Sequence, residues 1–306
     1  MSDHVYDVVI IGNGPAGCSA AIYAGRASLN ALRIEMGFPG GQVLNTSEVD
    51  NYPGLPEKGG MELADAFYEH SAKYGLEEKM EQALRIENAD APVKTVVTDG
   101  GSYQTKTVLV AAGAHHRVLG AEGEDVFTGR GVSYCATCDG GFYHGKTCLV
   151  IGGGDTAISD ALYLSHICEH VYLAVRRGEL RATGLYAKAA MAAENLTILW
   201  HTEVKKIYGD KKVSGVSLIN NQTGETSELA LDGVFVAVGI SPSNDLLKDL
   251  VKLDEGGFVY TDDYMETSVP GIFAAGDVRV KTLRQIVTAA SDGAVAITGI
   301  QKYLNS

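Results

Sequence analysis

The stretch YDVVIIGNGPAG, residues 6–17, joins an apolar run to a Gly-x-Gly-x-x-Gly turn. Small and apolar residues then continue at helical spacing from Ala16 to Ala27. A strand, a glycine-rich turn and a helix in this order are typical of a dinucleotide-binding unit. The glycines let the backbone approach a pyrophosphate at a helix N-terminus.

The next strand supports this interpretation. Ala31–Glu35 is apolar and β-rich, and it ends in an acid eighteen positions after Gly17. A carboxylate at this place can accept hydrogen bonds from two ribose hydroxyls, and it repels a 2′-phosphate. The sequence therefore predicts that this unit binds FAD or NAD rather than NADP.

A second unit of the same kind begins further along the chain. Lys146–Ile151 is a predicted strand, and the turn at residues 152–157 (GGGDTA) leads into a helix that runs through Ser165. The strand after it ends in Arg176-Arg177, with Arg181 four positions later. Arginine can hold a 2′-phosphate with two parallel hydrogen bonds. The pattern predicts an NADPH site, and a solvated charge run is the alternative.

A Cys-x-x-Cys motif lies between the two glycine turns, as Cys135-Ala136-Thr137-Cys138-Asp139. Two cysteines three positions apart can close a short disulfide that is easily reopened, and Asp139 places a proton carrier beside it. Half of a zinc site and two unrelated core cysteines are the other interpretations. The remaining cysteines occur in apolar patterns and are expected to be small buried residues; these are Cys18, Cys148 and Cys168.

Composition restricts the class of protein. A chain of 306 residues exceeds the size at which one core keeps growing, so two domains are expected. A net charge of −13 argues against general binding of nucleic acids or anionic membranes. The first residues, MSDH, lack a basic-then-apolar signal pattern. Five cysteines, an odd number, favour a reducing compartment, so a cytoplasmic location is expected.

Three further segments carry candidate binding residues. Residues 40–54 form a long polar connection that suits a cofactor surface, although a solvated excursion is the alternative. The predicted strand Tyr103–Val110 ends at small residues, 111–114, where a backbone can approach a flat or charged group. Residues 271–277 form another apolar strand that ends in Gly-Asp, and a helix is predicted from Leu283 to about Tyr303.

Together these motifs strongly resemble the low-molecular-weight thioredoxin reductases. The resemblance runs from Tyr6 to Tyr303 and includes the closing Gly-Asp and the Arg-Gln-x-x-Thr-Ala-Ala helix. It implies an α/β fold of two Rossmann-like domains, the second inserted into the first. The FAD domain would comprise residues 1–114 and 245–306, and the NADPH domain residues 115–244. The resemblance also implies a homodimer, and thioredoxin or a thioredoxin-like protein as partner.

The resemblance assigns site residues position by position. The FAD contacts it implies are Gly12, Gly14, Pro15, Ala16, Gly17, Glu35, Gly41, Gln42, Asn51, Ala112, Gly113, Gly276, Asp277, Arg284, Gln285 and Ala289. The NADPH contacts it implies are Gly153, Gly154, Asp155, Thr156, Ala157, Arg176, Arg177 and Arg181. No metal is expected.

The implied reaction moves a hydride from NADPH to FAD and then electrons to the Cys135–Cys138 disulfide. The dithiol would then reduce a disulfide on thioredoxin. Cys138 would face the flavin, Cys135 would attack the partner, and Asp139 would be the acid–base group. The cysteines and the nicotinamide site lie in the same domain, yet both must reach the flavin. A rotation about the crossings near residues 113–117 and 242–244 is therefore expected.

The chain departs from the family pattern at two places. Ser159-Asp160 stands where the family usually has a Glu pair, and Val175 stands where it usually has His. The arginines remain, so the departures bear on affinity for NADPH more than on its identity.

Other functions stay open at this point. A ferredoxin-dependent flavin disulfide reductase, which uses no nicotinamide, has no reason to keep the three arginines. An oxidase that makes disulfides in small dithiols does not need them either. A redox-silent FAD-binding scaffold would not respond to Cys138→Ser in turnover with a disulfide substrate. A zinc module would need two more ligands in a matching cluster.

Overall fold

The computed structural model describes residues 4–46, 48–181 and 184–306, in two compact units. Unit 1 comprises residues 1–115 and 241–306, and unit 2 comprises residues 116–240. The expectation of a cytoplasmic location rests partly on the first four residues. Of these, Met1–Asp3 lie outside the described residues. Within the described ranges, no helix has both the length and the apolar character that a membrane span requires.

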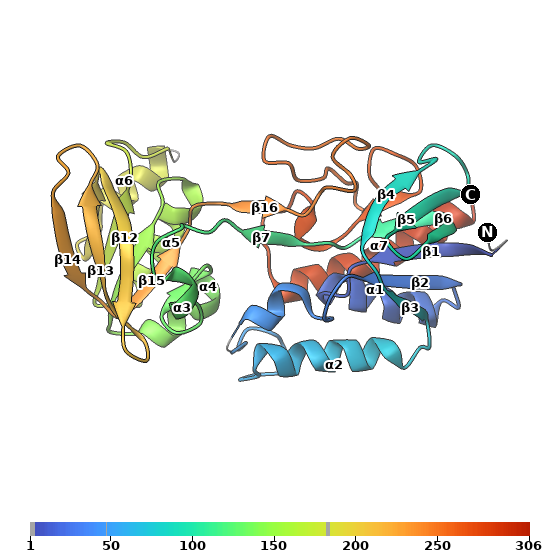
Figure 1. The fold of residues 1–306 in the computed structure, drawn as a ribbon, viewed down its shortest axis with the longest axis horizontal. Coiled ribbons are helices and arrows are strands. Elements are labelled where there is room, and N and C mark those ends of the chain that lie inside the picture. The colour runs from blue at the N-terminus through green and yellow to red at the C-terminus, as the bar shows by residue number, and fades with distance from the viewer. Residues whose placement is uncertain (1–3, 47, 182–183) are drawn as a thin grey trace. The chain divides into compact units, whose positions relative to one another are not determined.

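The sheet of unit 1 is parallel around its central strand β1 and antiparallel at one edge (Figure 1). The order β3-β2-β1-β6 is parallel, while β5 and β4 continue from the first half of β6 in antiparallel pairing. The second half of β6 pairs in parallel with β17. The bounds are β1 Val5–Ile11, β2 Ala31–Glu35, β3 Glu77–Met80, β4 Ala83–Glu87, β5 Lys94–Thr98, β6 Ser102–Val110 and β17 Ile272–Ala274.

Both faces of β1 are buried, which explains its uninterrupted apolar sequence. Val8 and Ile10 pack in one core cluster with helices α1 (Pro15–Arg26) and α7 (Ile286–Leu304). Val9 and Ile11 pack in a second cluster on the other face. Helix α2 (Gly60–Ala72) lies against α1.

Helices α1 and α7 lie side by side in Figure 1, and a glycine permits this close approach. A Cβ atom on Gly293 of α7 would lie 2.1 Å from the backbone oxygen of Ala16 on α1. The first turn of α1 is therefore fixed against the C-terminal segment of the chain. Segments at opposite ends of the sequence thereby meet beside the first glycine turn.

Unit 2 has a five-stranded parallel sheet in the order β11-β10-β9-β15-β8 and a separate antiparallel sheet of β12, β13 and β14. The strands are β8 Val132–Ser133, β9 Thr147–Ile151, β10 His170–Val175, β11 Leu196–Trp200, β12 Thr202–Gly209, β13 Val213–Asn220, β14 Thr226–Ala230 and β15 Gly233–Val236. The helices are α3 Glu124–Phe127, α4 Ala136–Asp139, α5 Asp155–Ser165 and α6 Gly184–Ala192. The predicted fold class, α/β with two Rossmann-like units, is confirmed.

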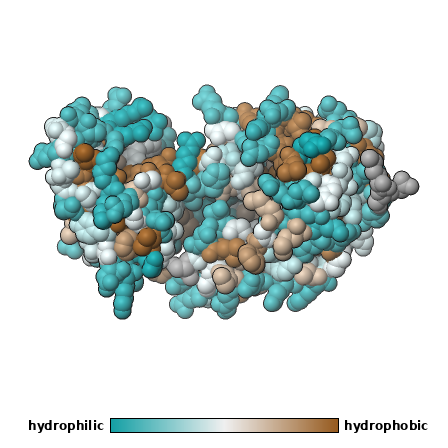
Figure 2. Space-filling view, viewed as in Figure 1, coloured by the Kyte–Doolittle hydropathy of each residue, from teal (hydrophilic) through white to brown (hydrophobic). Residues whose placement is uncertain are grey.

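The chain passes between the units within β7 (Ala114–His116) and β16 (Ile240–Pro242), which pair with each other. Hydrophilic residues cover most of the face shown in Figure 2, in keeping with the charged composition.

One predicted helix starts later than expected, and one strand of the unit 1 sheet has no signal of its own in the sequence. Helix α7 begins at Ile286 rather than at Leu283, because Gln285 is extended and forms a capping box with Thr288. Strand β3, sequence EEKM, follows neither an alternating nor a continuous apolar pattern, so no strand was predicted there. The prediction that Cys18, Cys148 and Cys168 are buried is confirmed.

Candidate functional site

The first glycine turn forms a cradle at the carboxyl end of β1. Gly12 has φ +104°, and a Cβ atom there would lie 2.5 Å from the backbone oxygen of Ala111. A Cβ atom on Gly17 would lie 1.7 Å from the oxygen of Gly12, so neither position accepts a side chain. Gly14 precedes α1, which begins with Pro15, and no described side chain caps this helix. The backbone N–H groups at this end are therefore available to an anion such as a pyrophosphate.

Glu35 lies at the end of β2, beside this turn. One carboxylate oxygen accepts a hydrogen bond from the backbone nitrogen of Asn13 at 2.8 Å, and the other accepts one from Gly37 at 3.1 Å. Each oxygen retains a second lone pair, so both can also accept a hydroxyl. The structure thus brings the predicted ribose-binding acid to the predicted pyrophosphate turn.

The segment after β2 folds back onto the glycine turn. The backbone nitrogen of Gly40 donates to the oxygen of Asn13 at 2.9 Å, and a Cβ atom on Gly41 would lie 3.4 Å from the Cα atom of Gly14. Gln42 follows in the short 3₁₀ helix Gly41–Asn45. Ala112 and Gly113 lie just after the carboxyl end of β6, the neighbour of β1.

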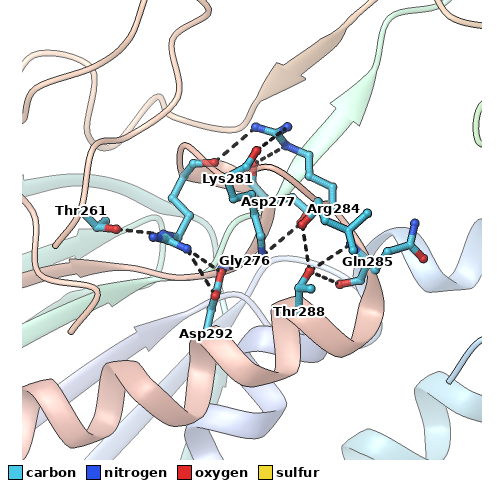
Figure 3. Close-up of polar contacts among 10 residues, drawn as sticks. Thr261, Gly276, Asp277, Lys281, Arg284, Gln285, Thr288 and Asp292 are labelled. Carbon is cyan, nitrogen blue, oxygen red and sulfur yellow. Dashed lines mark hydrogen bonds and ion pairs between the residues drawn. The ribbon is translucent and has the colours of Figure 1, made fainter. Parts of the chain in front are cut away.

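Asp277 lies after β17, near the start of α7, where Figure 3 shows it with Lys281 and Asp292. Its Oδ1 atom is buried and accepts no hydrogen bond from the described residues. Burial raises the pKa of Asp277, and the positive charges of Lys281 and Arg284 act in the opposite direction. A buried carboxylate oxygen with a free lone pair fits a donor such as a hydroxyl of a bound cofactor.

Asp292 of α7 fixes the segment that carries Asp277. One of its oxygens accepts hydrogen bonds from the backbone nitrogen of Gly276 at 3.0 Å and from the Lys281 ammonium at 2.8 Å. Arg279 lies 3.4 Å from the other oxygen. Since Asp292 and Lys281 are both nearly buried, these contacts hold the loop rigidly.

Two further predicted residues, Arg284 and Gln285, lie close by (Figure 3). The Arg284 guanidinium stacks over the Phe258 ring, 4.0 Å from its centroid, and its Nε donates to the Asp277 backbone oxygen at 3.4 Å. The Gln285 side chain accepts a hydrogen bond from Asn51 at 3.0 Å. Ala289 is buried one turn into α7. The residues predicted for FAD therefore converge on one region of unit 1.

In unit 2 the Cys135 and Cys138 sulfurs form a disulfide. Cys135 immediately precedes α4, and its backbone oxygen accepts hydrogen bonds from the nitrogens of Cys138 and Asp139. Ser133 holds the chain just before the pair by accepting a hydrogen bond from the Cys135 nitrogen at 3.1 Å. Because the sulfurs are bonded to each other, they are not a free ligand pair in this structure.

Asp139, the last residue of α4, is largely buried. Burial raises its pKa, while a hydrogen bond with Ser133 acts in the opposite direction. Its Oδ1 atom has no hydrogen-bond partner among the described residues. A carboxyl group with a raised pKa binds a proton more tightly, so it can hold one next to the disulfide and give it up later.

The second glycine turn follows β9 and resembles the first. Gly152 has φ +151°, and a Cβ atom there would lie 2.4 Å from the Ala237 oxygen. Gly154 precedes α5, and no described side chain caps that helix. A Cβ atom on Gly153 would lie 3.1 Å from the side chain of Val175, which packs against the turn. Asp155, Thr156 and Ala157 form the first turn of α5.

The three arginines lie exposed after β10. The backbone nitrogen of Arg181 donates to the Gly153 oxygen at 2.8 Å, which brings this segment to the turn. Across the described part of the chain, the Arg176, Arg177 and Arg181 guanidinium groups make neither ion pairs with acidic side chains nor hydrogen bonds. Three cations beside an uncapped helix start can bind a phosphate.

The departures from the family pattern have visible consequences. Burial raises the pKa of Asp160 on α5 to about 6. Val175 is almost fully buried, so it offers no polar group to a ligand at this position.

Sequence reasoning missed several residues around these sites. Asn13, Glu78, Lys281 and Asp292 all make partly buried polar contacts that no local motif indicates. The described residues include no cluster of three or more His, Cys, Asp or Glu side chains placed to hold a metal ion.

The matches to known proteins extend over nearly the whole chain. Residues 6–293 match the family model described as pyridine nucleotide-disulphide oxidoreductase. A thioredoxin reductase of Bacillus subtilis (strain 168) is 43% identical over 303 residues, which are 99% of this chain and 96% of that protein. The crystal structure of thioredoxin reductase from Streptococcus pyogenes MGAS5005 is 46% identical, with a TM-score of 0.94 and 99% of each chain covered. Thioredoxin reductase from Giardia duodenalis is 32% identical, with a TM-score of 0.94, 99% of this chain and 100% of that chain covered.

Proposed function

The chain belongs to the pyridine nucleotide-disulphide oxidoreductase family, and from this premise we propose that it is an NADPH-dependent thioredoxin-disulfide reductase. Membership implies the use of a flavin and a pyridine nucleotide. The observation that carries the proposal is the Cys135–Cys138 disulfide, which lies in the same unit as a glycine turn flanked by three exposed arginines.

FAD is the flavin that unit 1 fits, and the proposed FAD domain is residues 1–114 with 245–306. The glycine cradle would hold the pyrophosphate, and Glu35 the adenosine ribose. The Asp277 Oδ1 atom, which accepts no hydrogen bond from the described residues, suits a hydroxyl of the ribityl chain. When bound, FAD supplies the two-electron chemistry between nicotinamide and disulfide.

NADPH is the nucleotide that unit 2 fits, in a proposed domain of residues 115–244. The pyrophosphate would lie at the start of α5, and Arg176, Arg177 and Arg181 would hold the 2′-phosphate. The exposed arginines favour NADPH over ferredoxin as electron donor, since a ferredoxin-dependent enzyme has no use for them.

The cysteine pair reduces the partner by thiol–disulfide exchange. The Cys135 thiolate attacks one sulfur of the thioredoxin disulfide and forms a mixed disulfide, and the other thioredoxin sulfur leaves as a thiolate. Cys138 then attacks Cys135 and releases the second thioredoxin thiol. Asp139, whose pKa is raised by burial, holds and returns the proton that these steps require.

The pair and the nicotinamide site share one unit, while the flavin site lies in the other. We therefore expect unit 2 to rotate about β7 and β16 during turnover. A covalent crosslink between the units that leaves steady-state turnover unchanged would contradict this rotation. A homodimer and a cytoplasmic location are also proposed, from the family resemblance; sedimentation of the purified protein tests the dimer.

The direct test is NADPH-dependent reduction of a thioredoxin disulfide by the purified FAD-loaded enzyme. Wild type should sustain turnover, and Cys135→Ser and Cys138→Ser should each abolish it. Cys168→Ser is the matched control, because Cys168 lies outside the redox pair. Full turnover by the Cys138→Ser variant would identify a redox-silent scaffold instead.

A further inference from the structure

A partly buried ion pair, of a buried Arg33 with a Glu78 side chain that is 26% exposed, lies next to the first glycine turn. Strands β2 and β3 pair in a register that places Arg33 directly beside Glu78, and the Arg33 Nη2 atom lies 2.9 Å from a Glu78 oxygen. The Arg33 side chain is only 2% exposed. Charges are rarely buried to this extent unless they are paired, so this pair requires an explanation.

Helix α2 completes the surroundings of the pair. Arg33 donates a second hydrogen bond to the Ser71 hydroxyl at 2.7 Å. The Tyr68 hydroxyl donates to the same Glu78 oxygen as Arg33, at 2.9 Å, and this bond raises the pKa of Tyr68. The Glu78 carboxylate is thus held from two sides in one orientation.

The other oxygen of Glu78 reaches the glycine turn. It accepts a hydrogen bond from the Asn13 side-chain amide at 2.7 Å, and Asn13 is fully buried. The backbone nitrogen of Asn13 in turn donates to Glu35 at 2.8 Å, and its backbone oxygen accepts from Gly40. A continuous chain of contacts therefore runs from Arg33 through Glu78 and Asn13 to Glu35.

Stability alone does not account for this arrangement. Burying the Arg33 charge and part of the Glu78 charge costs about as much as their attraction returns, and apolar residues of similar volume often serve as well. The arrangement does fix Asn13, the single residue between Gly12 and Gly14. The backbone N–H group of Asn13 donates to Glu35, so the position of Asn13 orients the Glu35 carboxylate.

We propose that Glu78, held by Arg33 and Tyr68, is a positioning residue for the adenosine half of the dinucleotide at the first glycine turn. It acts through the Asn13 side chain, which fixes the backbone N–H that orients Glu35. This inference rests on the proposed function, because it takes FAD to be the ligand of unit 1.

The test is a double-mutant cycle on FAD binding to the apoprotein, followed by quenching of flavin fluorescence. The variants are Glu78→Gln, Asn13→Ala and the combination of both. Glu77→Gln is the matched control, since Glu77 precedes Glu78 on β3 and accepts a hydrogen bond from Tyr6 instead. ADP as a competitor of FAD reports the adenosine half alone.

Glu78→Gln and Asn13→Ala should each weaken FAD and ADP binding roughly tenfold, as expected when a hydrogen bond to a charged group is lost. The double variant should bind no more weakly than Glu78→Gln alone, because both changes break one path. Glu77→Gln should bind as wild type. NADPH binding to unit 2 should not change in any variant, and a general loss of folding would alter it.

Three results would overturn the inference. Unchanged FAD and ADP affinity in a folded Glu78→Gln variant would show that the ion pair serves the fold alone. Losses that simply add in the double variant would show that Glu78 does not act through Asn13. If Glu78→Gln does not fold, Asn13→Ala leaves no charge unpaired, and wild-type affinity in that variant would contradict the proposal. A wild-type apoprotein that binds neither FAD nor ADP would instead overturn the proposed function itself.

Discussion

The Lys281 ammonium lies 4.0 Å from the Asp277 oxygen that accepts no hydrogen bond from any described residue. The same ammonium donates to Asp292 at 2.8 Å, and the Lys281 side chain is only 7% exposed. One buried cation thus lies between two carboxylates at the proposed flavin site. Burial raises the pKa of Asp277, and the charge of Lys281 acts in the opposite direction.

Replacing Lys281 by methionine should destabilise the fold, because Asp292 would lose its closest cation. Breaking a buried pair by removing one partner costs about 3 kcal/mol or more. Urea denaturation of the apoprotein measures the change. Lys248→Met is the matched control, since Lys248 forms an exposed pair with Asp245 and its loss should change stability far less. Equal losses in the two variants would contradict this account.

Asp160 should make stability depend on pH. Burial raises its folded-state pKa to about 6, above the ordinary value of 3.8, so the folded state binds the proton more tightly than the unfolded state. Stability from this group is therefore present below about pH 4 and is lost as the pH rises to about 6.

At about pH 7.5, the variant Asp160→Asn should melt at a higher temperature than wild type. At about pH 4, the two proteins should melt at nearly the same temperature. Asp210→Asn, in an exposed turn, should match wild type at both values. An Asp160→Asn variant less stable than wild type at neutral pH would show that the carboxylate has a stabilising partner.

The arginines after β10 should decide between the two nicotinamide nucleotides. Arg176→Gln with Arg177→Gln should raise the KM for NADPH roughly tenfold to a hundredfold, because charge-assisted hydrogen bonds to the 2′-phosphate are lost. The KM for NADH, which lacks this phosphate, should hardly change and is the internal control. A parallel rise for both nucleotides would indicate damage to the turn rather than a lost phosphate contact.

Asp139→Asn should separate the two halves of the reaction. Losing a positioned acid–base group costs about 10²-fold or more in the step it assists. Thioredoxin reduction should slow by that factor, while reduction of the flavin by NADPH in stopped flow should keep its wild-type rate. If flavin reduction slows by the same factor, Asp139 maintains the structure of unit 2 rather than transferring a proton.

Much of the fold could be predicted because its signals are local. The apolar strands, the two glycine turns, the acid at the end of β2 and the arginines after β10 all appear within short windows of sequence. At Gly17, for example, the close contact with Gly12 explains why the motif needs glycine. The Cys135–Cys138 motif could be recognised for the same reason, whereas the short helix α4 that begins right after Cys135 was not predicted.

The rest depends on contacts between distant residues. Strand β3 is charged and exists because it pairs with β2, so its own sequence does not predict it. Glu78 meets Asn13 across sixty-five positions, and no motif records that contact. The start of α7 was placed too early because the Gln285–Thr288 capping box was not foreseen.

The measurement that tests the central claim most directly is an anaerobic titration of the FAD-loaded protein with NADPH, and separately with NADH. The visible flavin absorbance is followed throughout. We predict bleaching by NADPH at a much lower concentration than by NADH. Absence of bleaching with either nucleotide would contradict the proposed NADPH site and would direct the search to ferredoxin as the electron donor.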